Sequence, residues 1–322
     1  MPDKHKPRAG SMQYWPRKRA SSPVARVRSW ASGKNAQLLG FAGYKVGMTH
    51  VIAVDNRPKS LTKGEKISIP VSIIECPAIK IASVRVYKNG KVAGEYLAKN
   101  LDKELARKLS LSKKNAKVLD ELNPDDFDEL RANVYTQPKR TGIGKKKPEF
   151  FEVAVGGSKE DALNYLKENL GKEIDVADIF SEGQMVDVHS VTKGKGYQGP
   201  VKRFGISVKS IKSEKIKRAP GSIAGGWKAH GHMMYRVPDA GQTGFHTRTE
   251  HNKQILSIND NPELVNPQGG FVRYGLVKNK YLLVKGSIGG ARKRLVRFCM
   301  PLRKKPEGAF DIVEISTKSK QG

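Results

Sequence analysis

The chain has 322 residues, 38% of them hydrophobic, so it is long enough for one large domain or two to three ordinary ones with a real core. Sixty lysines and arginines against 31 acids give a formal net charge of +29, an excess that indicates a polyanionic partner. No run of about 18 apolar residues occurs and the first residues lack an apolar signal core, so we expect no membrane partner and no export. Nucleic acid is the better candidate.

The positive charge is concentrated in three segments. Residues 1–40, 193–236 and 278–305 together carry 28 of the 29 net charges, whereas residues 100–180 hold 16 acids against 15 lysines and arginines. A block of like charge is often only a solvated or disordered tail. Three separate blocks of one sign, two of them interleaved with glycines and aromatic residues, favour a binding surface instead.

The first part of the chain changes from an irregular segment to a β-rich one. Residues 1–37 show no periodicity and are interpreted as a basic N-terminal extension, and residues 38–99 predict the first part of a β domain, a barrel or a sandwich. Asn89-Gly90 separates two alternating runs and predicts a hairpin, because both turn residues tolerate positive φ. Cys76 and Cys299 lie in apolar stretches, which favours buried free thiols in a reducing compartment, the cytoplasm.

Residues 100–180 are expected to form an α-helical insertion. Residues 101–134 place apolar side chains such as Leu101 and Leu105 at helical spacing. Residues 158–171 begin with a serine, carry acids in the first turn and end on a glycine, which matches the preferences of helix starts and stops.

A second β-rich set predicts that this β domain continues over residues 181–204 and is completed by residues 269–316, before a short tail over 317–322. In the last part, KNK joins the runs FVRYGLV and YLLVKG and predicts another hairpin. Many short strands punctuated by glycine and proline indicate a mainly β fold, a barrel or a sandwich. Residues 205–268 show neither period and are interpreted as a long central basic loop, which is usually either functional or disordered.

Four of the seven histidines, His230, His232, His246 and His251, fall within 22 residues. A zinc site there would make a metal-dependent nuclease possible. No cysteine lies nearby, however, and the surrounding positive charge repels a dication. Imidazoles that contact phosphate, ribose or base fit these surroundings better, so we expect no metal.

Two glycine-rich basic stretches, residues 191–205 and 287–294, allow the backbone to approach a phosphate while lysines and arginines neutralise its charge. The first stretch lacks the GK[ST] ending of a nucleotide-binding loop, and no helix is expected after it. No serine has both a histidine and an orienting carboxylate in a recognised arrangement. We therefore expect no enzyme, no cofactor and no small-molecule substrate.

Trp227 stands between glycines and a lysine, outside any apolar repeat. One interpretation is a small core within the loop, formed with Met233, Met234 and Tyr235. The other is contact with structured RNA, where a rigid aromatic ring stacks on or wedges beside bases. The sequence leaves both open.

The candidate RNA-binding residues are the basic, histidine and tryptophan side chains of these segments. They are Arg17, Lys18, Arg19, Arg26, Arg28, Lys193, Lys195, Lys202, Arg203, Lys209, Lys215, Lys217, Arg218, Trp227, Lys228, His230, His232, Arg236, His246, Arg248, Lys253, Arg292, Lys293 and Arg294.

Several motifs agree in order and spacing with one known family. The stretches HKPRAGSMQYWPRKRA, VTKGKGYQGPVKRFG and PGSIAGGWKAHGHMMYRVPDAGQTGFHTRTEHNK resemble the archaeal branch of the universal L-three family of large-subunit ribosomal proteins. The resemblance covers essentially the whole chain. A free nucleic-acid chaperone is the alternative function.

The resemblance implies a six-stranded β-barrel of the translation-protein type, a helical insertion, and two long non-globular extensions that enter ribosomal RNA. It also implies early binding near the 3′ domain of that RNA, and a central finger with Trp227 at its tip that reaches toward the aminoacyl side of the peptidyl transferase centre. The implied protein neighbours are large-subunit protein fourteen and a zinc-ribbon protein. Side-chain modifications known in the family do not carry over, since Lys215 stands where eukaryotic members have a modifiable histidine.

Overall fold

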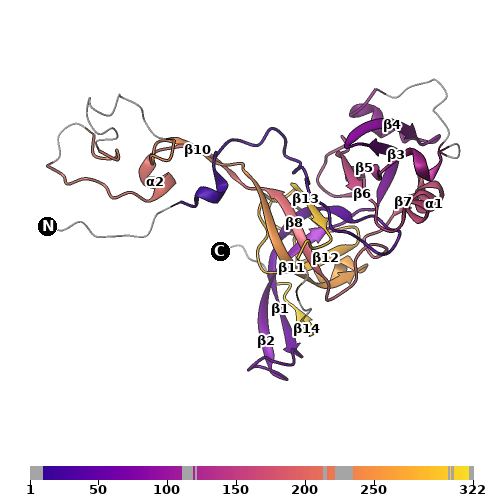
Figure 1. Ribbon diagram of the computed structural model, residues 1–322. Coiled ribbons are helices and arrows are strands. Elements are labelled where there is room, and N and C mark those ends of the chain that lie inside the picture. The colour runs from indigo at the N-terminus through magenta and orange to yellow at the C-terminus, as the bar shows by residue number, and fades with distance from the viewer. Residues whose placement is uncertain are drawn as a thin grey trace, which may run out of the picture. The chain divides into compact units, whose positions relative to one another are not determined.

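The computed structural model describes residues 10–110, 119, 122–212, 216–221, 235–303, 305 and 308–318. The chain divides into two compact units. Unit 1 comprises residues 1–23 and 191–247, and unit 2 comprises residues 24–190 and 248–322. Strands outnumber helices among the described residues, which confirms the expected mainly β fold (Figure 1).

The larger sheet is built on one long strand. Its members are β1 (Gly40–Asp55), β2 (Lys66–Glu75), β8 (Met185–Val191), β11 (Thr247–Asn259), β12 (Tyr281–Lys285), β13 (Leu295–Cys299) and β14 (Phe310–Ile315). The strand order is β13, β8, β11, β12, β2, β1, β14, and β1 also pairs with β13. Six strands therefore pair in a circuit that returns to β1. The long strand reaches both neighbours because its first residues pair with β13 and its last with β14.

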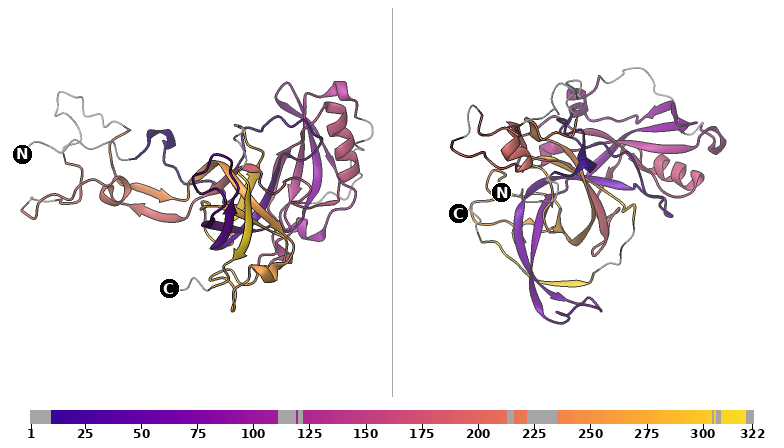
Figure 2. Two further views of the ribbon diagram at one scale, coloured as in Figure 1. Left: turned by 90° about the horizontal axis from the view of Figure 1, so that it is seen from below. Right: turned by 60° about the vertical axis from the view of Figure 1, so that its left-hand side comes forward.

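The side chains of this sheet form much of the hydrophobic core. Tyr44, Phe41, Tyr281 and Phe298 are among the largest side chains buried almost completely. The second half of β2 is buried at every position, so its sequence, Val-Ser-Ile-Ile-Glu, shows no alternation of apolar and polar residues. Figure 2 shows β1 and β2 running side by side as a long antiparallel pair.

A second sheet is formed by β3 (Ile79–Lys88), β4 (Lys91–Leu97), β5 (Glu129–Tyr135), β6 (Phe150–Ala154) and the two-residue β7 (Glu173–Ile174). Its order is β4, β3, β5, β6, and β7 also pairs with β3. The predicted hairpin is confirmed, since Asn89 and Gly90 join β3 to β4 with φ of 51° and 70°.

Helix α1 (Lys159–Asn169) confirms the start predicted from the sequence. The Ser158 hydroxyl accepts a hydrogen bond from the Asp161 backbone N–H at 3.2 Å, which satisfies one of the unpaired donors of the first turn. The helix buries Ala162, Leu163 and Leu166.

The expected helical insertion over 100–180 is wrong for much of its length. Apart from α1, its described helices are single 3₁₀ turns, η2 (Lys103–Arg107), η4 (Pro124–Asp126) and η5 (Pro138–Arg140). Residues 129–135 form β5, whose buried Leu130, Ala132 and Val134 pack in the core between β3 and β6. Pairing on both sides outweighs local helical spacing. Strands β3 and β4, which lie within residues 38–99, belong to this second sheet and not to the larger one.

One further expectation fails near the end of the chain. The predicted hairpin around KNK does not form, because residues 271–277 make a tight turn closed by a bridge between Phe271 and Gly275. The backbone N–H groups of Lys278 and Asn279 donate instead to the buried carboxylate of Glu75, at 2.9 and 3.0 Å. This contact anchors the turn to β2.

The central loop was also predicted too long. Residues 247–259, placed inside the 205–268 loop, form β11, and its residues 255–259 pair with β12. A 3₁₀ turn, η7 (Pro262–Leu264), follows. The first half of β11 is only half-buried and polar, so the sequence shows no strand alternation there.

Unit 1 contains a two-stranded ribbon of β9 (Gly194–Gln198) and β10 (Gly241–Gly244), the short helix α2 (Pro200–Phe204) and the 3₁₀ turn η1 (Met12–Tyr14). The helix lies within the glycine-rich stretch 191–205 itself and not after it. Pro200 suits its first turn, and Gly205 ends it in the left-handed conformation at φ 69°.

Candidate nucleic-acid interface

The ribbon brings the two ends of the central loop together. Gly241 pairs with Gln198, and Thr243 with Gly196. Gly244 has φ of 72°, and a Cβ at this position would lie 2.0 Å from the Lys193 carbonyl oxygen. Only glycine allows this approach. Lys193 and Lys195 are consequently held at exposed positions on a defined backbone.

The N-terminal segment packs against the same end of the ribbon. The Ala20 backbone N–H donates to the Phe245 carbonyl at 2.8 Å, and the guanidinium of Arg19 lies 5.3 Å from the Phe245 ring centre. The ring nitrogen Nδ1 of His246 is 2.7 Å from the Lys18 carbonyl oxygen. Residues far apart in sequence thus form one unit.

His246 was predicted to bind RNA, but its ring makes its hydrogen bond within unit 1, to the Lys18 carbonyl. The residue is 9% exposed, and its backbone N–H donates to the Thr192 hydroxyl at 3.1 Å. The sequence showed a histidine among basic residues and gave no sign that the N-terminal segment covers it.

A small aromatic cluster, defined by Trp15, Phe204 and Tyr235, forms beside α2. The Trp15 ring centre lies 6.0 Å from that of Phe204 and 5.9 Å from that of Tyr235. The Arg17 guanidinium lies over Phe204 at 4.3 Å, a cation–π contact. Arg203 donates to the Asp239 carbonyl at 3.0 Å. These two predicted RNA contacts therefore stabilise unit 1 from within.

Most of the other predicted cations of unit 1 are exposed. They are Lys18, Arg19, Lys193, Lys195, Lys202, Lys209, Lys217, Arg218 and Arg236. The described part of unit 1 has twelve lysines and arginines and a single acid, Asp239. Such a strongly basic surface attracts polyanions over a distance of about one Debye length, roughly 8–10 Å. Lys215, Trp227, Lys228, His230 and His232 lie outside the described residues.

The predicted residues of unit 2 are divided between exposed and engaged side chains. Arg26 and Arg28 are exposed and alternate with buried Ala25 and Val27. Arg248 is half-buried on β11.

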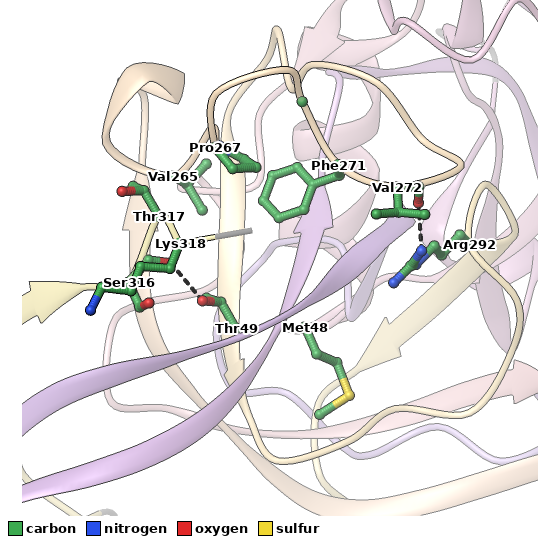
Figure 3. Close-up of a pocket in the computed structure, with 11 residues that line it drawn as sticks. Met48, Thr49, Val265, Pro267, Phe271, Val272, Arg292, Ser316, Thr317 and Lys318 are labelled. Atoms are coloured by element: carbon green, nitrogen blue, oxygen red, sulfur yellow. Dashed lines mark hydrogen bonds between the residues drawn. The ribbon is translucent and has the colours of Figure 1, made fainter. Parts of the chain in front are cut away.

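The third basic block is partly used for internal contacts. Figure 3 shows Arg292 beside a small pocket, where its guanidinium donates to the Val272 carbonyl at 2.6 Å. Lys293 is exposed in the left-handed conformation at φ 68°, and burial lowers the pKa of Arg294. Lys253, on β11, pairs with Glu250 at 3.1 Å.

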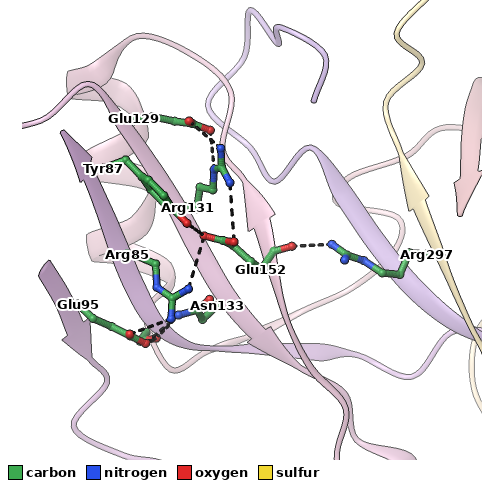
Figure 4. Close-up of polar contacts among 9 residues, drawn as sticks. Arg85, Tyr87, Glu95, Glu129, Arg131, Asn133, Glu152 and Arg297 are labelled. Atoms are coloured by element: carbon green, nitrogen blue, oxygen red, sulfur yellow. Dashed lines mark hydrogen bonds and ion pairs between the residues drawn. The ribbon is translucent and has the colours of Figure 1, made fainter. Parts of the chain in front are cut away.

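An ion-pair network crosses the second sheet (Figure 4). Arg85 pairs with Glu95 at 3.1 Å, Arg131 pairs with Glu129 at 2.7 Å, and both arginines approach the Glu152 carboxylate at 3.9 and 3.8 Å. These charges neutralise one another. This face offers little attraction to a phosphate backbone, unlike unit 1.

The described parts of both units lack the side-chain groupings of a metal site. They contain no group of three histidine, cysteine or acidic side chains placed to hold a metal, and the His251 ring lies 2.8 Å from the Asp187 carboxylate. No described helix is both long and apolar enough to cross a membrane. Cys76 and Cys299 are free and buried as predicted, and burial raises the pKa of the Cys299 thiol to about 12.

The fold and the charge together define a mainly β, strongly basic protein with a glycine-rich, strongly basic unit. These properties are typical of proteins that bind structured nucleic acid. The chain belongs to the ribosomal protein L3 family, whose model matches residues 1–322. This confirms the resemblance drawn from the motifs.

Three similar proteins come from archaea. The large ribosomal subunit protein uL3 of Archaeoglobus fulgidus is 46% identical over 331 residues, covering 99% of both chains. Those of Methanothrix thermoacetophila and Methanocaldococcus jannaschii are 45% and 43% identical, each covering 99% of this chain and 98% of the relative. All three carry the name of a ribosomal protein and of no enzyme, in agreement with the non-enzymatic function predicted.

Proposed function

We propose that the chain is a structural constituent of the large ribosomal subunit, bound to ribosomal RNA in the cytoplasm. The single observation that carries this function is the strongly basic surface of unit 1, with twelve cations and one acid among its described residues. Membership of the L3 family and the names of the archaeal relatives support it.

The circuit of six paired strands supports a barrel of the translation-protein type that docks on the RNA surface. In this proposal the N-terminal segment and the central loop enter RNA as extensions, and the protein binds early in assembly near the 3′ domain. Large-subunit protein fourteen and a zinc-ribbon protein are the proposed neighbours. The exposed lysines and arginines neutralise phosphates and release counterions.

Trp227 is proposed to be the tip of the central loop, near the aminoacyl side of the peptidyl transferase centre. Residues 199–240 connect β9 to β10, so the ribbon fixes both ends of the segment that contains Trp227. Glycines on its N-terminal side and Lys228 after it suit close contact with RNA.

Sedimentation of extracts tests the proposed function. The tagged full chain should be found almost wholly with large subunits, because a structural constituent has no free pool at steady state. A chain found mainly in the light fractions would be a nucleic-acid chaperone, and a chain that copurified with stoichiometric zinc or manganese would be a metal-dependent nuclease. Either result would contradict the proposal.

Trp227→Ala tests the role of the tip. Subunit incorporation and the free energy of unfolding should stay unchanged, whereas aminoacyl-tRNA accommodation should slow, since one tip contact is small beside many phosphate contacts. Tyr235→Ala is the matched comparison, because Tyr235 packs on Trp15 and its loss should destabilise unit 1. A loss of several kcal/mol on Trp227→Ala would instead identify Trp227 as part of a core within the loop.

A further inference from the structure

The turn between β1 and β2 has a fixed shape. The carboxylate of Asp55 is fully buried and accepts hydrogen bonds from Arg57 Nη2 at 2.7 Å, Ser60 Oγ at 2.6 Å and Thr62 Oγ1 at 2.7 Å. The Arg57 guanidinium holds the pKa of the Asp55 carboxyl far below its usual range. The turn is therefore organised before any partner binds.

A pocket of about 690 Å³ lies beside this turn in unit 2. Its walls include Arg57 and Lys59 from the turn, Lys253 from β11, Lys285 at the end of β12 and Phe310 at the start of β14. Pockets of about 300–1,000 Å³ hold ligands of the size of a nucleotide. Nothing in the sequence grouped these residues, since they come from four separate strands or turns.

The charges of the pocket are only partly compensated. Arg57 pairs with Asp55 at 2.7 Å, and Lys253 pairs with Glu250 at 3.1 Å. Among the described residues, no carboxylate lies within 4.0 Å of the ammonium groups of Lys59 and Lys285. Two positive charges therefore remain for a ligand.

Lys285 is the more informative of the two. Its side chain is half-buried, and its ammonium lies 4.1 Å from the Phe310 ring centre. Burial, followed by the nearby Arg57, lowers the pKa of Lys285, and Asp55 offsets this in part. A partly desolvated cation without a carboxylate partner gains from a bound anion.

We propose that this pocket holds one nucleotide of an RNA chain, with its phosphate bound by Lys285 and Lys59. The inference rests on the proposed ribosomal RNA partner and adds to it a binding site in unit 2, away from the glycine-rich segments. The Phe310 ring and the stems of the lysines supply apolar surface for the sugar or base. An acidic peptide is the competing occupant.

Lys285→Gln in the full chain tests the site, and Lys91→Gln is its charge-matched comparison, because Lys91 is exposed on β4. Binding to a large-subunit ribosomal RNA transcript is measured by filter retention at several KCl concentrations, and unfolding by urea checks that each variant folds. Lys285→Gln should weaken binding and reduce the salt slope by about one. Lys91→Gln should match the wild type. Ultraviolet cross-linking of the wild-type complex should attach RNA to a peptide that contains Phe310 or Lys59.

Each outcome decides between the two proposals. Failure of the wild-type chain to bind the transcript would overturn the proposed function itself. Normal binding by the wild type, with Lys285→Gln equal to Lys91→Gln and no cross-link in the pocket, would overturn only the pocket. A variant that binds RNA normally but no longer binds an acidic peptide of glutamates would assign the pocket to a protein partner.

Discussion

His189 on β8 makes stability depend on pH. Its ring is buried, with Nδ1 3.0 Å from the Thr249 hydroxyl. Burial, and then Arg297, lower the pKa of His189 to about 4, with a smaller lowering by His251 and an opposing effect of Asp187. The unfolded chain takes up this proton near pH 6.5 and the folded chain only near pH 4. Stability is therefore lost as the pH falls between these values.

We expect the free energy of unfolding to fall by about 2 to 3 kcal/mol from this group between pH 7 and 4.5. His189→Gln removes the titrating ring, so urea unfolding of the variant should depend less on pH by that amount. Carboxylates that titrate in the same range affect both proteins equally. An identical pH dependence in the two proteins would show that His189 is not the group responsible.

Arg297 shows what charge blocks cannot reveal about single residues. It stands in the third basic block, yet it is 4% exposed and donates to the carbonyls of Ala25 at 3.0 Å and Glu152 at 2.5 Å. Its guanidinium also lies 4.5 Å from the Phe151 ring centre. These partners are distant in sequence. Composition could therefore locate the block but not separate this internal arginine from the exposed Lys293.

At the scale of elements, the ribbon of unit 1 depends on Gly244. In Gly244→Ala, the new Cβ would meet the Lys193 carbonyl 2.0 Å away while the backbone keeps a positive φ. Strain of this kind costs about 1–3 kcal/mol before the clash is counted. We expect faster cleavage of unit 1 in limited proteolysis, with the cleavage rate of unit 2 unchanged.

Gly199→Ala is the comparison for this experiment, since nothing lies within 4 Å of the added Cβ and its φ is an ordinary −71°. Its cleavage pattern should match the wild type. Equal cleavage of the two variants would mean that the ribbon tolerates a side chain at Gly244.

Elements with local signals were predictable, and elements defined by distant partners were not. Asn89-Gly90 fixes a turn by its own backbone preference, and Ser158 starts a helix by its own hydroxyl. By contrast, β5 becomes a strand because β3 and β6 pair with it, and the polar first half of β11 carries no alternation. The same limit applies to the site. The motifs located both the basic loop and the N-terminal segment, but not the contacts between them.

On the scale of the whole molecule, positive charge is not only abundant but concentrated in particular regions. Unit 1 carries 17 lysines and arginines against three acids. The second sheet pairs its charges across strands, as Arg85 and Arg131 do with Glu152. If RNA affinity follows local placement, equal changes in net charge should have unequal effects in the two regions.

Two variants of equal net charge test this placement, each with five cations changed to glutamine. One alters the exposed unit 1 residues Lys193, Lys195, Lys202, Lys217 and Arg218, and the other alters the exposed Lys88, Lys91, Lys99, Lys103 and Lys172 around the second sheet. The first should lower the salt slope of ribosomal RNA binding by about 4, because each phosphate contact contributes about 0.7–0.9. The second should keep the wild-type slope. Equal decreases of the salt slope in both variants would show that RNA binding responds to total charge alone, and that the strongly basic surface of unit 1 is not the binding surface.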